Sequence, residues 1–441
     1  MRKRRIVIIG GGIAGLAAAA SARKTDAKAE ITVLSKEPYS PYRKASLPYV
    51  IQGTILRPNE IAMYPSPLLK PKKILLLRGF EAHGIYVNER TVTARNVKTK
   101  KEKAFSYDAL VLAMGGSAFI PPIQGIEKES VYSFTTFKDA FEISQRIRVN
   151  ENAVIVGAGP IGLKVGEALI KRKVNVTVVE KAYILYGHIE PSFSLSLKEQ
   201  IKHRYLKMMT GVSPKGIGGK KAVEYVEVDE EKIPASVVIF ATGVRPFVKL
   251  AEEAGIELGK YGVYIDDRMH TSVSEVYAAG DCAETLDFTT KKRTFIPAGS
   301  IAAQEGMIAG INAAGGDKRT GGFLRIEADN FFGTEITSMG HGSVMAKRLG
   351  IKVSVEDIKL PSAIGNRPYF AEKYPARVKV VADQKGKVIG VQVICHKWGA
   401  PNSYALLQAI KERMTIGELK ELWKLPLASM ADFSIMKTGY Y

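Results

Sequence analysis

The chain has 441 residues, of which 46% are hydrophobic and 24% charged, so it is long enough for about three domains and is not wholly disordered. Its apolar runs are shorter than the roughly 18 residues that span a bilayer, and its start lacks the pattern of a secretory signal. Two cysteines, Cys282 and Cys395, exclude a disulfide scaffold and a cysteine-based zinc or iron–sulfur site. We therefore expect a protein of a reducing compartment, the cytoplasm.

The charge is strongly basic. Lysine and arginine total 64 against 44 acidic residues, which gives a net charge of +20. Such a surface favours anionic partners: phosphorylated cofactors, acidic proteins, lipid headgroups or nucleic acid. The basic residues are scattered and no base-reading motif accompanies them, which favours a solvated basic surface and no nucleic-acid partner. The six histidines show no spacing typical of metal ligands, so no metal site is expected.

The first predicted elements form a nucleotide-binding unit. A β-branched strand, a glycine loop, an alanine-rich helix and a second strand are predicted at 5–9, 10–15, 16–22 and 31–34. Gly10 permits a tight turn, Gly12 lets a pyrophosphate approach the backbone, and Gly15 lets the helix pack on the strand. The helix N-terminus favours an anion, so the loop, including Ile13 and Ala14, is predicted to bind pyrophosphate.

The end of the second strand is where an acidic residue usually binds a ribose. This chain reads Ser35, Lys36 and Glu37 at that point, so the acid is displaced by two residues. Either Glu37 or the Ser35 hydroxyl is predicted to bind the ribose.

The same pattern returns in the middle of the chain. A strand at 153–156, a helix to about Lys173 and a strand at 176–180 enclose a second glycine loop, formed by Gly157, Ala158, Gly159, Pro160, Ile161 and Gly162. Glu180 ends the second strand, where a carboxylate binds both ribose hydroxyls and repels a 2′-phosphate, so NADH is favoured over NADPH. Lys181 partly compensates that repulsion, so NADPH stays open.

Two such units about 150 residues apart resemble the flavoproteins with two dinucleotide-binding domains, in which FAD occupies the first unit and NAD(P)H the second. The resemblance implies further contacts at the segments that close each domain, at the aspartate motif that holds the ribityl chain, and at the start of the next helix. For FAD these are Ala113, Met114, Gly115, Gly280, Asp281 and Ala298, and for NAD they are Thr242 and Gly243.

Within this superfamily the chain is most similar to the coenzyme A-disulfide reductase, NADH oxidase and NADH peroxidase group. Residues 45–53 resemble its Cys-Gly-Leu-Pro-Tyr-Tyr-Ile segment, and 119–125 resemble its domain linker. The last hundred-odd residues fit its dimerisation domain, with a predicted hairpin at 378–393 and a helix capped by Thr415 and Glu418.

The resemblance implies an α/β fold with two Rossmann-like domains and a C-terminal α+β dimerisation domain, and hence a homodimer. The FAD domain is expected at 1–118 and 244–325, the NAD(P)H domain at 119–243, and the dimerisation domain at 326–441.

One departure from the family matters for the chemistry. Ala45 occupies the position of the redox cysteine, and alanine cannot form a thiolate, a sulfenate or a mixed disulfide. Cys282 and Cys395 are predicted to be small buried hydrophobic residues, and His396 points to the opposite face of its strand from Cys395. Arg43 is either a contact of the flavin or FAD phosphates, or a solvated loop residue. Lys164 stands where the family usually has a glutamate.

Three functions are compatible with these residues. The first is an FAD-dependent NAD(P)H oxidase or dehydrogenase that passes electrons to oxygen, a quinone or a small redox protein without a redox cysteine. The second is a coenzyme A-disulfide or polysulfide reductase in which Cys282 or a bound low-molecular-weight thiol supplies the sulfur. The third is a non-catalytic flavin- or NAD-binding subunit of a larger complex.

Overall fold

The computed structural model describes residues 3–63, 73–359, 377–396 and 403–424. The chain divides into two compact units. The first comprises 1–157, 168–176 and 214–323, and the second comprises 158–167, 177–213 and 324–441. The expected boundaries at residues 118, 243 and 325 stay a prediction.

A five-stranded parallel sheet forms the centre of the first unit. Its order is β18-β7-β1-β2-β3, with the bounds Val276–Ala278, Ala109–Leu112, Arg5–Ile9, Glu30–Ser35 and Ile74–Arg78. The four residues of β7 are all buried, as are the last four of β1, which is typical of parallel strands covered on both faces. This sheet confirms the first predicted strand–loop–helix–strand unit.

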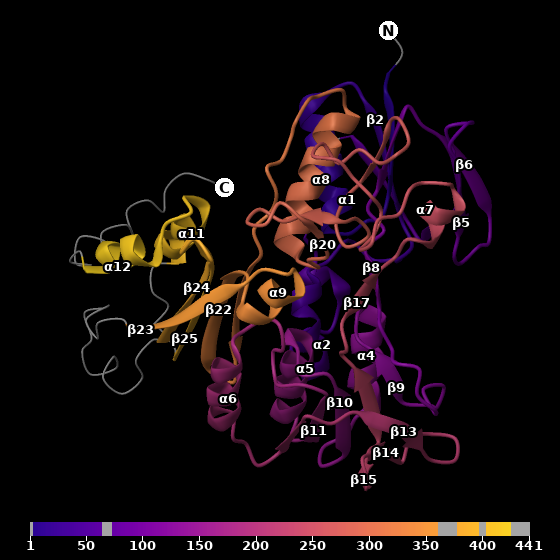
Figure 1. The fold of residues 1–441 in the computed structure, drawn as a ribbon. Coiled ribbons are helices and arrows are strands. Elements are labelled where there is room, and N and C mark those ends of the chain that lie inside the picture. The colour runs from indigo at the N-terminus through magenta and orange to yellow at the C-terminus, as the bar shows by residue number, and fades with distance from the viewer. Residues whose placement is uncertain (1–2, 64–72, 360–376, 397–402, 425–441) are drawn as a thin grey trace. The chain divides into compact units, whose positions relative to one another are not determined.

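Two helices of this unit, α1 (Ile13–Thr25) and α8 (Gly299–Ala313), lie side by side (Figure 1). They approach closely because α8 carries glycines where it meets α1. A Cβ atom on Gly306 would lie 2.9 Å from the Cα of Ala14, and one on Gly310 would lie 2.7 Å from the Cα of Ala18. No side chain fits in that space, so the two helix backbones are in contact.

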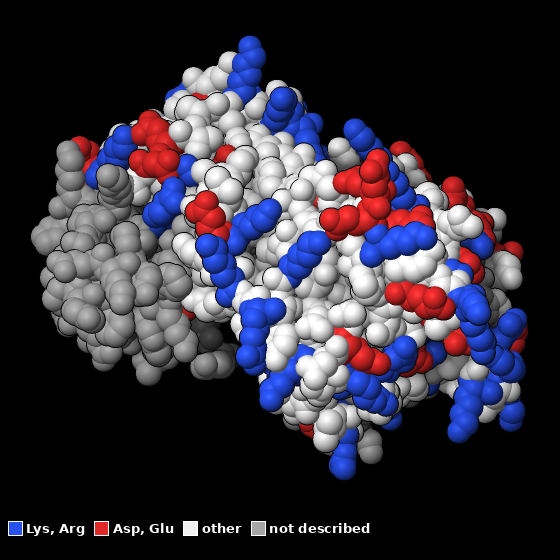
Figure 2. Space-filling model, turned by 90° about the horizontal axis from the view of Figure 1, so that it is seen from below, with Lys and Arg blue, Asp and Glu red and all other residues white. Residues whose placement is uncertain are grey.

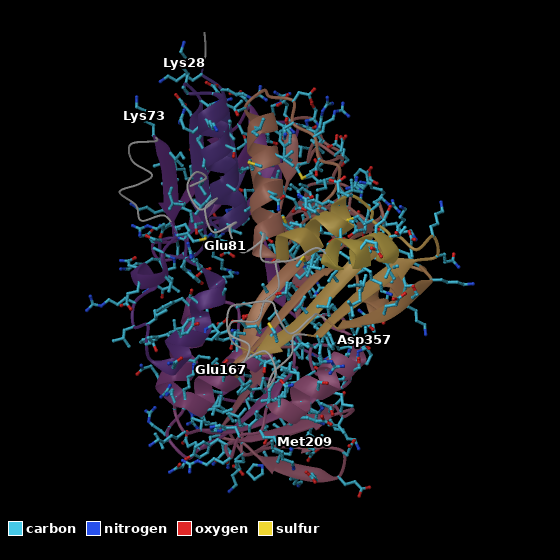
Figure 3. All side chains as sticks on the ribbon, turned by 90° about the vertical axis from the view of Figure 1, so that its left-hand side faces the viewer. Lys28, Lys73, Glu81, Glu167, Met209 and Asp357 are labelled. Atoms are coloured by element: carbon cyan, nitrogen blue, oxygen red, sulfur yellow. The ribbon has the colours of Figure 1, made fainter. Side chains whose placement is uncertain are left out.

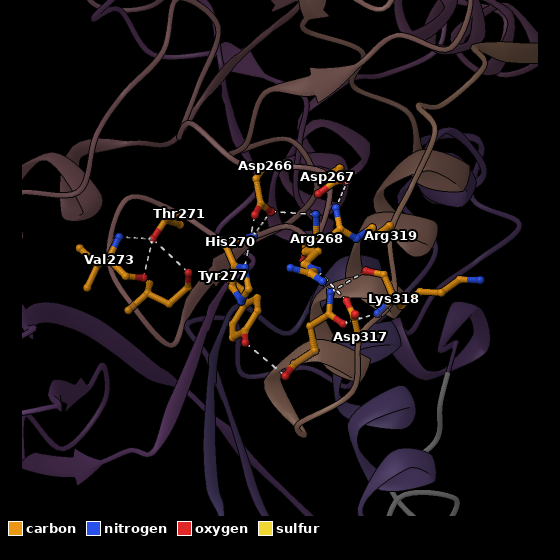
Figure 4. Close-up of polar contacts among 12 residues, drawn as sticks. Asp266, Asp267, Arg268, His270, Thr271, Val273, Tyr277, Asp317, Lys318 and Arg319 are labelled. Atoms are coloured by element: carbon orange, nitrogen blue, oxygen red, sulfur yellow. Dashed lines mark hydrogen bonds and ion pairs between the residues drawn. The ribbon is translucent and has the colours of Figure 1, made fainter.

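A polar cluster fixes the chain where it leaves α8 (Figure 4). The buried amide of Asn312 donates to the carbonyls of Arg268 and Lys318, each at 2.8 Å, and accepts from the N–H of Lys318 at 2.7 Å. An ion pair between Arg319 and Asp267 at 3.1 Å supports the same turn. Asn312 therefore holds the turn that follows α8 against the segment that contains Arg268.

The first unit contains further strands and helices. A parallel set is formed by β9 (Val131–Ser133), β16 (Val237–Phe240) and β10 (Asn152–Val156). Two antiparallel sheets contain β4 (Phe80–Tyr86), β5 (Thr91–Asn96) and β6 (Glu102–Ser106), and β13 (Pro214–Gly218), β14 (Tyr225–Val228) and β15 (Glu231–Pro234). The others are α2 (Leu47–Gln52), α4 (Phe137–Arg146), α7 (Lys249–Glu253), β8 (Gly116–Ala118), β17 (Val244–Pro246), β19 (Thr285–Leu286) and β20 (Arg293–Thr294).

The second unit contains a five-stranded antiparallel sheet of order β21-β22-β25-β24-β23. The strands are Ile326–Phe331, Thr334–Gly340, Val388–His396, Arg377–Asp383 and Val353–Lys359, and the helices α9 (Ser343–Arg348), α11 (Ser403–Lys411) and α12 (Ile416–Lys424) belong to the same part of the chain. The antiparallel pairing of β24 with β25 confirms the predicted hairpin. Thr415 and Glu418 form the predicted capping box, with bonds of 3.2 and 2.6 Å.

Two sets of ion pairs join residues within this unit. Lys379, with only 8% of its side chain exposed, pairs with Asp357 at 2.7 Å across β24 and β23; Asp357 is labelled in Figure 3. Glu327 binds His188 at 2.7 Å and Arg325 at 2.9 Å. Burial alone would raise the pKa of Glu327, but the hydrogen bond from His188 and the charges of Arg325 and His188 lower it to about 2.

The second unit also contains α6 (Pro191–Gln200) and β12 (Leu206–Thr210), while α5 (Pro160–Lys171) and β11 (Asn175–Glu180) each span both units. No helix of the described residues is long and apolar enough to cross a membrane. Nor do those residues contain a group of histidine, cysteine and acidic side chains that could hold a metal ion. Figure 2 shows basic side chains spread over one face with acidic ones among them.

Candidate functional site

The first glycine loop leaves its backbone open at one point. Gly10 has a φ of +118°, and a Cβ atom there would collide with the carbonyl of Ala113. A Cβ on Gly15 would collide with the Gly10 carbonyl oxygen and would lie 3.3 Å from the Ile8 side chain, so the first turn of α1 packs closely against the strand and its loop. In contrast, nothing lies within 4 Å of a Cβ on Gly12, which caps α1 without any side-chain hydrogen bond. The N-terminus of α1 therefore has the room and the free donors that a pyrophosphate needs.

The strand end of β2 is arranged by a residue that the sequence did not indicate. Tyr42 is buried, and its hydroxyl donates to Glu37 Oε2 at 2.6 Å and accepts from the Phe137 N–H at 2.8 Å. Burial and the Glu37 charge raise the pKa of Tyr42, so the phenol remains a donor. One carboxylate oxygen of Glu37 is thereby fixed, and the carboxylate is oriented by the chain itself.

Ser35 and Lys36, the other two predicted residues at this strand end, have different surroundings. Ser35 is buried beside the glycine loop, because a Cβ on Gly11 would lie 2.7 Å from its hydroxyl oxygen. The Lys36 ammonium pairs with Glu81 at 2.7 Å, and both side chains are largely exposed; Glu81 is labelled in Figure 3. Ser35 and Glu37 therefore remain the candidates for the ribose.

The aspartate motif lies next to the same loop. Gly280 has a φ of +75°, and a Cβ there would come within 3.0 Å of the Ala14 side chain. Burial raises the pKa of the Asp281 carboxyl, while the charge of Lys44 lowers it. No described residue donates a hydrogen bond to that carboxyl. A partly buried carboxyl without a protein donor is suited to accept hydroxyls of a bound cofactor.

The other predicted FAD contacts are near these segments. A Cβ on Gly116, two residues after Met114, would lie 3.5 Å from the Asp281 Cβ, and Gly115, with a φ of +73°, faces open space. Ala298 precedes the first residue of α8. A Cβ on Gly299, which follows it, would lie 3.9 Å from the Ile13 side chain. The structure thus brings the segments at 10–15, 113–116, 280–281 and 298–299 together.

No thiol is available near these segments in a reactive form. Arg43, Lys44 and Ala45 are exposed in the turn before α2. Cys282 is fully buried, and its thiol donates to the carbonyls of Leu112 and Ala279 at 3.4 and 3.5 Å. Burial raises the pKa of Cys282 to about 11, so it is protonated at neutral pH and is a poor nucleophile.

Cys395 is 5% exposed, in β25, with its sulfur 3.9 Å from Glu335 Oε2. Both cysteines are buried, as predicted. The side chain of His396 lies outside the described residues.

The second glycine loop repeats this geometry. Gly157 has a φ of +106°, and a Cβ there would touch the Ala241 carbonyl, whereas a Cβ on Gly159 would meet nothing within 4 Å. The Glu180 carboxylate accepts from the N–H groups of Ala158 and Ala182, each at 2.9 Å. It is therefore held at the strand end beside its glycine loop, with lone pairs left for a ligand.

The remaining predicted NAD residues are divided between the two units. Ile161 is 43% exposed at the start of α5, next to Pro160 and Gly162, and Lys181 is exposed beyond Glu180. In the first unit, the Thr242 hydroxyl donates to the Phe119 carbonyl, and Gly243, with a φ of +100°, faces open space.

Lys164 takes part in a contact that local sequence could not indicate. Its ammonium pairs with Asp329 at 2.7 Å, donates to the Asn330 carbonyl at 2.5 Å, and lies 5.2 Å from the centre of the Phe331 ring. The cation of α5 is thereby bound to β21 of the same unit. A glutamate at position 164 would face Asp329 as a like charge.

The chain is similar to known proteins over most of its length. Residues 4–306 match the family described as pyridine nucleotide-disulphide oxidoreductase. A protein named NADH oxidase from Methanocaldococcus jannaschii is 32% identical over 95% of this chain and 93% of its own length. One named NAD(P)H coenzyme A polysulfide/persulfide reductase from Pyrococcus horikoshii is 30% identical over 89% and 87%. The structure of an NAD-dependent persulfide reductase from A. fulgidus superimposes with a TM-score of 0.86 at 29% identity, over 94% of this chain and 78% of that one.

Proposed function

Because the chain belongs to the pyridine nucleotide-disulphide oxidoreductase family, and is an FAD-dependent oxidoreductase of NAD(P)H, we propose that it transfers electrons from NADH to an acceptor without a redox-active cysteine. When bound, FAD supplies the chemistry of accepting hydride and passing electrons on. The contribution of this chain is to bind and orient the two nucleotides and to leave the acceptor side free of a thiol.

FAD binding is assigned to residues of the first unit. The open N-terminus of α1 at Gly12 holds the pyrophosphate, where backbone donors and the helix dipole favour an anion. Glu37, oriented by Tyr42, or Ser35 accepts the ribose hydroxyls. The Asp281 carboxyl, which has no donor among the described residues, accepts hydroxyls of the ribityl chain.

NADH binding is assigned to the second glycine loop. Gly159 gives the pyrophosphate access to the backbone, and Glu180 accepts the ribose hydroxyls. The carboxylate is fixed by two backbone N–H groups, so it cannot turn away from a 2′-phosphate. NADH is therefore the preferred donor over NADPH.

The observation that carries the proposal is the absence of a usable thiol. By the family resemblance, Ala45 stands at the position of the redox cysteine, and Cys282 is fully buried, with burial raising its pKa to about 11. Without a thiol at this position, the residues present would leave a bound flavin to pass electrons directly to oxygen, a quinone or a small redox protein. With oxygen the product is hydrogen peroxide, because no sulfenate is present to reduce it to water. We further propose a cytoplasmic homodimer, as the family resemblance implies.

The test is anaerobic stopped-flow reduction of the FAD-loaded protein by NADH, followed by mixing with air-saturated buffer. The proposal expects rapid loss of the visible flavin absorbance without a long-wavelength charge-transfer band, and then reoxidation that releases hydrogen peroxide. A long-lived thiolate charge-transfer band would overturn it. Flavin reduction no faster than that of free FAD would also overturn it, in favour of a non-catalytic subunit.

The names of two similar proteins favour one second candidate, a coenzyme A-dependent polysulfide or persulfide reductase. This function requires a thiol at the flavin, and the fully buried Cys282 is the cysteine of the first unit. Loss of polysulfide-dependent NADH oxidation in Cys282→Ser would support this candidate. Unchanged turnover in that variant would remove it.

A further inference from the structure

A carboxyl group is buried beneath the aspartate motif. Glu305 lies within α8 and is 0% exposed. Its Oε2 accepts from the Gly280 N–H at 2.8 Å, and its Oε1 lies 2.9 Å from the Thr285 hydroxyl. Both partners belong to the short segment that contains Asp281. The proposed ligands of FAD do not include Glu305.

The Gly280 peptide decides where Asp281 points. Gly280 has a φ of +75°, and the Ala283 N–H donates to the Gly280 carbonyl at 2.8 Å, so Asp281 is an inner residue of the turn formed by 280–283. Glu305 accepts a hydrogen bond from the N–H of Gly280, the first residue of this turn. It accepts a second one from the hydroxyl of Thr285, two residues after the turn ends. The carboxyl therefore fixes both ends of the segment that presents Asp281.

We propose that Glu305 is a positioning residue for FAD: it fixes the Gly280 turn on α8 and thereby orients Asp281 toward the ribityl chain. This rests on the proposed function, because it assumes that FAD occupies the site next to Asp281. Glu305 does not touch the cofactor, and it acts through the Gly280 peptide.

The groups around Glu305 determine its protonation. Asp281 contributes a nearby negative charge, Thr285 and the Gly280 N–H contribute hydrogen bonds, and the Cys282 thiol is the other titratable group close to it. On the α1 side the neighbours of α8 are small apolar residues such as Ala14. The cation in this region, Lys44, acts on Asp281. Burial raises the pKa of Glu305 to about 8, although its two hydrogen bonds lower it in part.

The direction of the pH effect follows from these charges. Below about pH 8 the carboxyl is mostly neutral, and above it a second negative charge lies next to Asp281 and next to an anionic cofactor. Bound FAD disfavours the ionised carboxyl further, so linkage requires FAD affinity to fall as pH rises through the pKa. If bound FAD raises the pKa of Glu305 by one unit, the affinity for FAD is tenfold weaker at high pH than at low pH.

The experiment is equilibrium titration of the apoprotein with FAD, followed by flavin fluorescence, from pH 6 to pH 9.5. In the wild type the Kd is expected to rise by about three- to tenfold across this range. In Glu305→Gln, which keeps an acceptor for Gly280 but cannot ionise, the Kd is expected to stay level. Glu305→Ala, which lacks both hydrogen bonds, is expected to bind FAD more weakly at every pH. A lower Kd in Glu305→Gln than in Glu305→Ala would show that the hydrogen bond to Gly280 positions the segment.

Glu284→Gln is the matched control. Glu284 is 2% exposed and close in the chain, but its carboxylate accepts from the Tyr261 N–H at 2.7 Å instead of from Gly280. Its Kd is expected to follow the wild-type pH dependence. Circular dichroism of each apoprotein shows whether a variant folds.

Two results would overturn the inference: a wild-type pH slope retained in Glu305→Gln, or an unchanged Kd in a folded Glu305→Ala. Failure of the proposed function itself gives a different result, because the wild type would then not bind FAD, or would bind it without reduction by NADH. A wild type that binds FAD and is reduced by NADH, with variants that do not differ from it, removes only the role of Glu305.

Discussion

The contact between α1 and α8 leads to a prediction about Gly306. A Cβ atom there would lie 2.8 and 2.9 Å from the carbonyl carbon and Cα of Ala14, distances that real Cβ atoms essentially never show. Gly306→Ala must therefore push the two helices apart. Overpacking of this kind costs about 1–3 kcal/mol, and the gain of about 1 kcal/mol in helix propensity offsets part of it. Because the contact is backbone against backbone, we expect the upper part of that range, a net loss of about 2 kcal/mol.

The consequence reaches the nucleotide loop, because Ala14 is in the first turn of α1. Thermal unfolding of the apoprotein is expected to show a Tm lower by about 4–8 °C, and the Kd for FAD is expected to rise. Gly299→Ala in the same helix is the control, since its nearest neighbour would be the Ile13 side chain at 3.9 Å. Equal stability of the Gly306 and Gly299 variants would refute the reasoning.

Three further predictions concern other parts of the chain. Asn312→Ala removes three partly buried hydrogen bonds, so we expect the free energy of unfolding, measured by urea titration, to fall by about 2–4 kcal/mol. Lys318→Ala is the control: only the backbone of Lys318 takes part in these bonds, so its free energy of unfolding should stay within about 0.5 kcal/mol of the wild type. Glu180→Ser is expected to reduce the preference for NADH over NADPH, measured as the ratio of kcat/KM values, at least tenfold; an unchanged ratio would contradict the role of the carboxylate. Since the pKa of Glu327 is about 2 in the folded protein, its contribution is present above its ordinary pKa near 4.5 and lost as pH falls toward 2. Between pH 4.5 and 2 the free energy of unfolding of the wild type should therefore fall by about 1–3 kcal/mol more than that of Glu327→Gln. The same pH dependence in both proteins would contradict this role of Glu327.

The features that the sequence predicted well depend on residues that lie close together in the chain. The strand, glycine loop, helix and strand at the start follow from β-branched runs and from glycines that the turn at Gly10 requires. The capping box at Thr415 and the hairpin at 378–393 likewise depend on residues a few positions apart. Local pattern is sufficient for such elements because their hydrogen bonds form between near neighbours.

The features that the sequence could not predict depend on residues far apart in the chain. The hydroxyl of Tyr42 joins Glu37 to the first residue of α4, and Glu305 binds the turn at Gly280. No periodicity or motif encodes such pairs, because each is created by the packing of separate elements. Lys36 illustrates the same limit: its ammonium pairs with Glu81 on β4, a contact that the motif does not indicate.

The pair between Lys164 and Asp329 has a consequence for inheritance. The two residues are 165 positions apart, and their side chains are 26% and 41% exposed, so the ion pair contributes about 1 kcal/mol or less. A relative with the family's usual glutamate at position 164 would place it next to the acid at position 329, and the two like charges would repel. We therefore expect the two positions to vary together among relatives. A chimera that joins the nucleotide-binding part of one relative to the C-terminal part of another would separate the two matched charges, and changing either mismatched residue to the opposite charge should restore the lost stability.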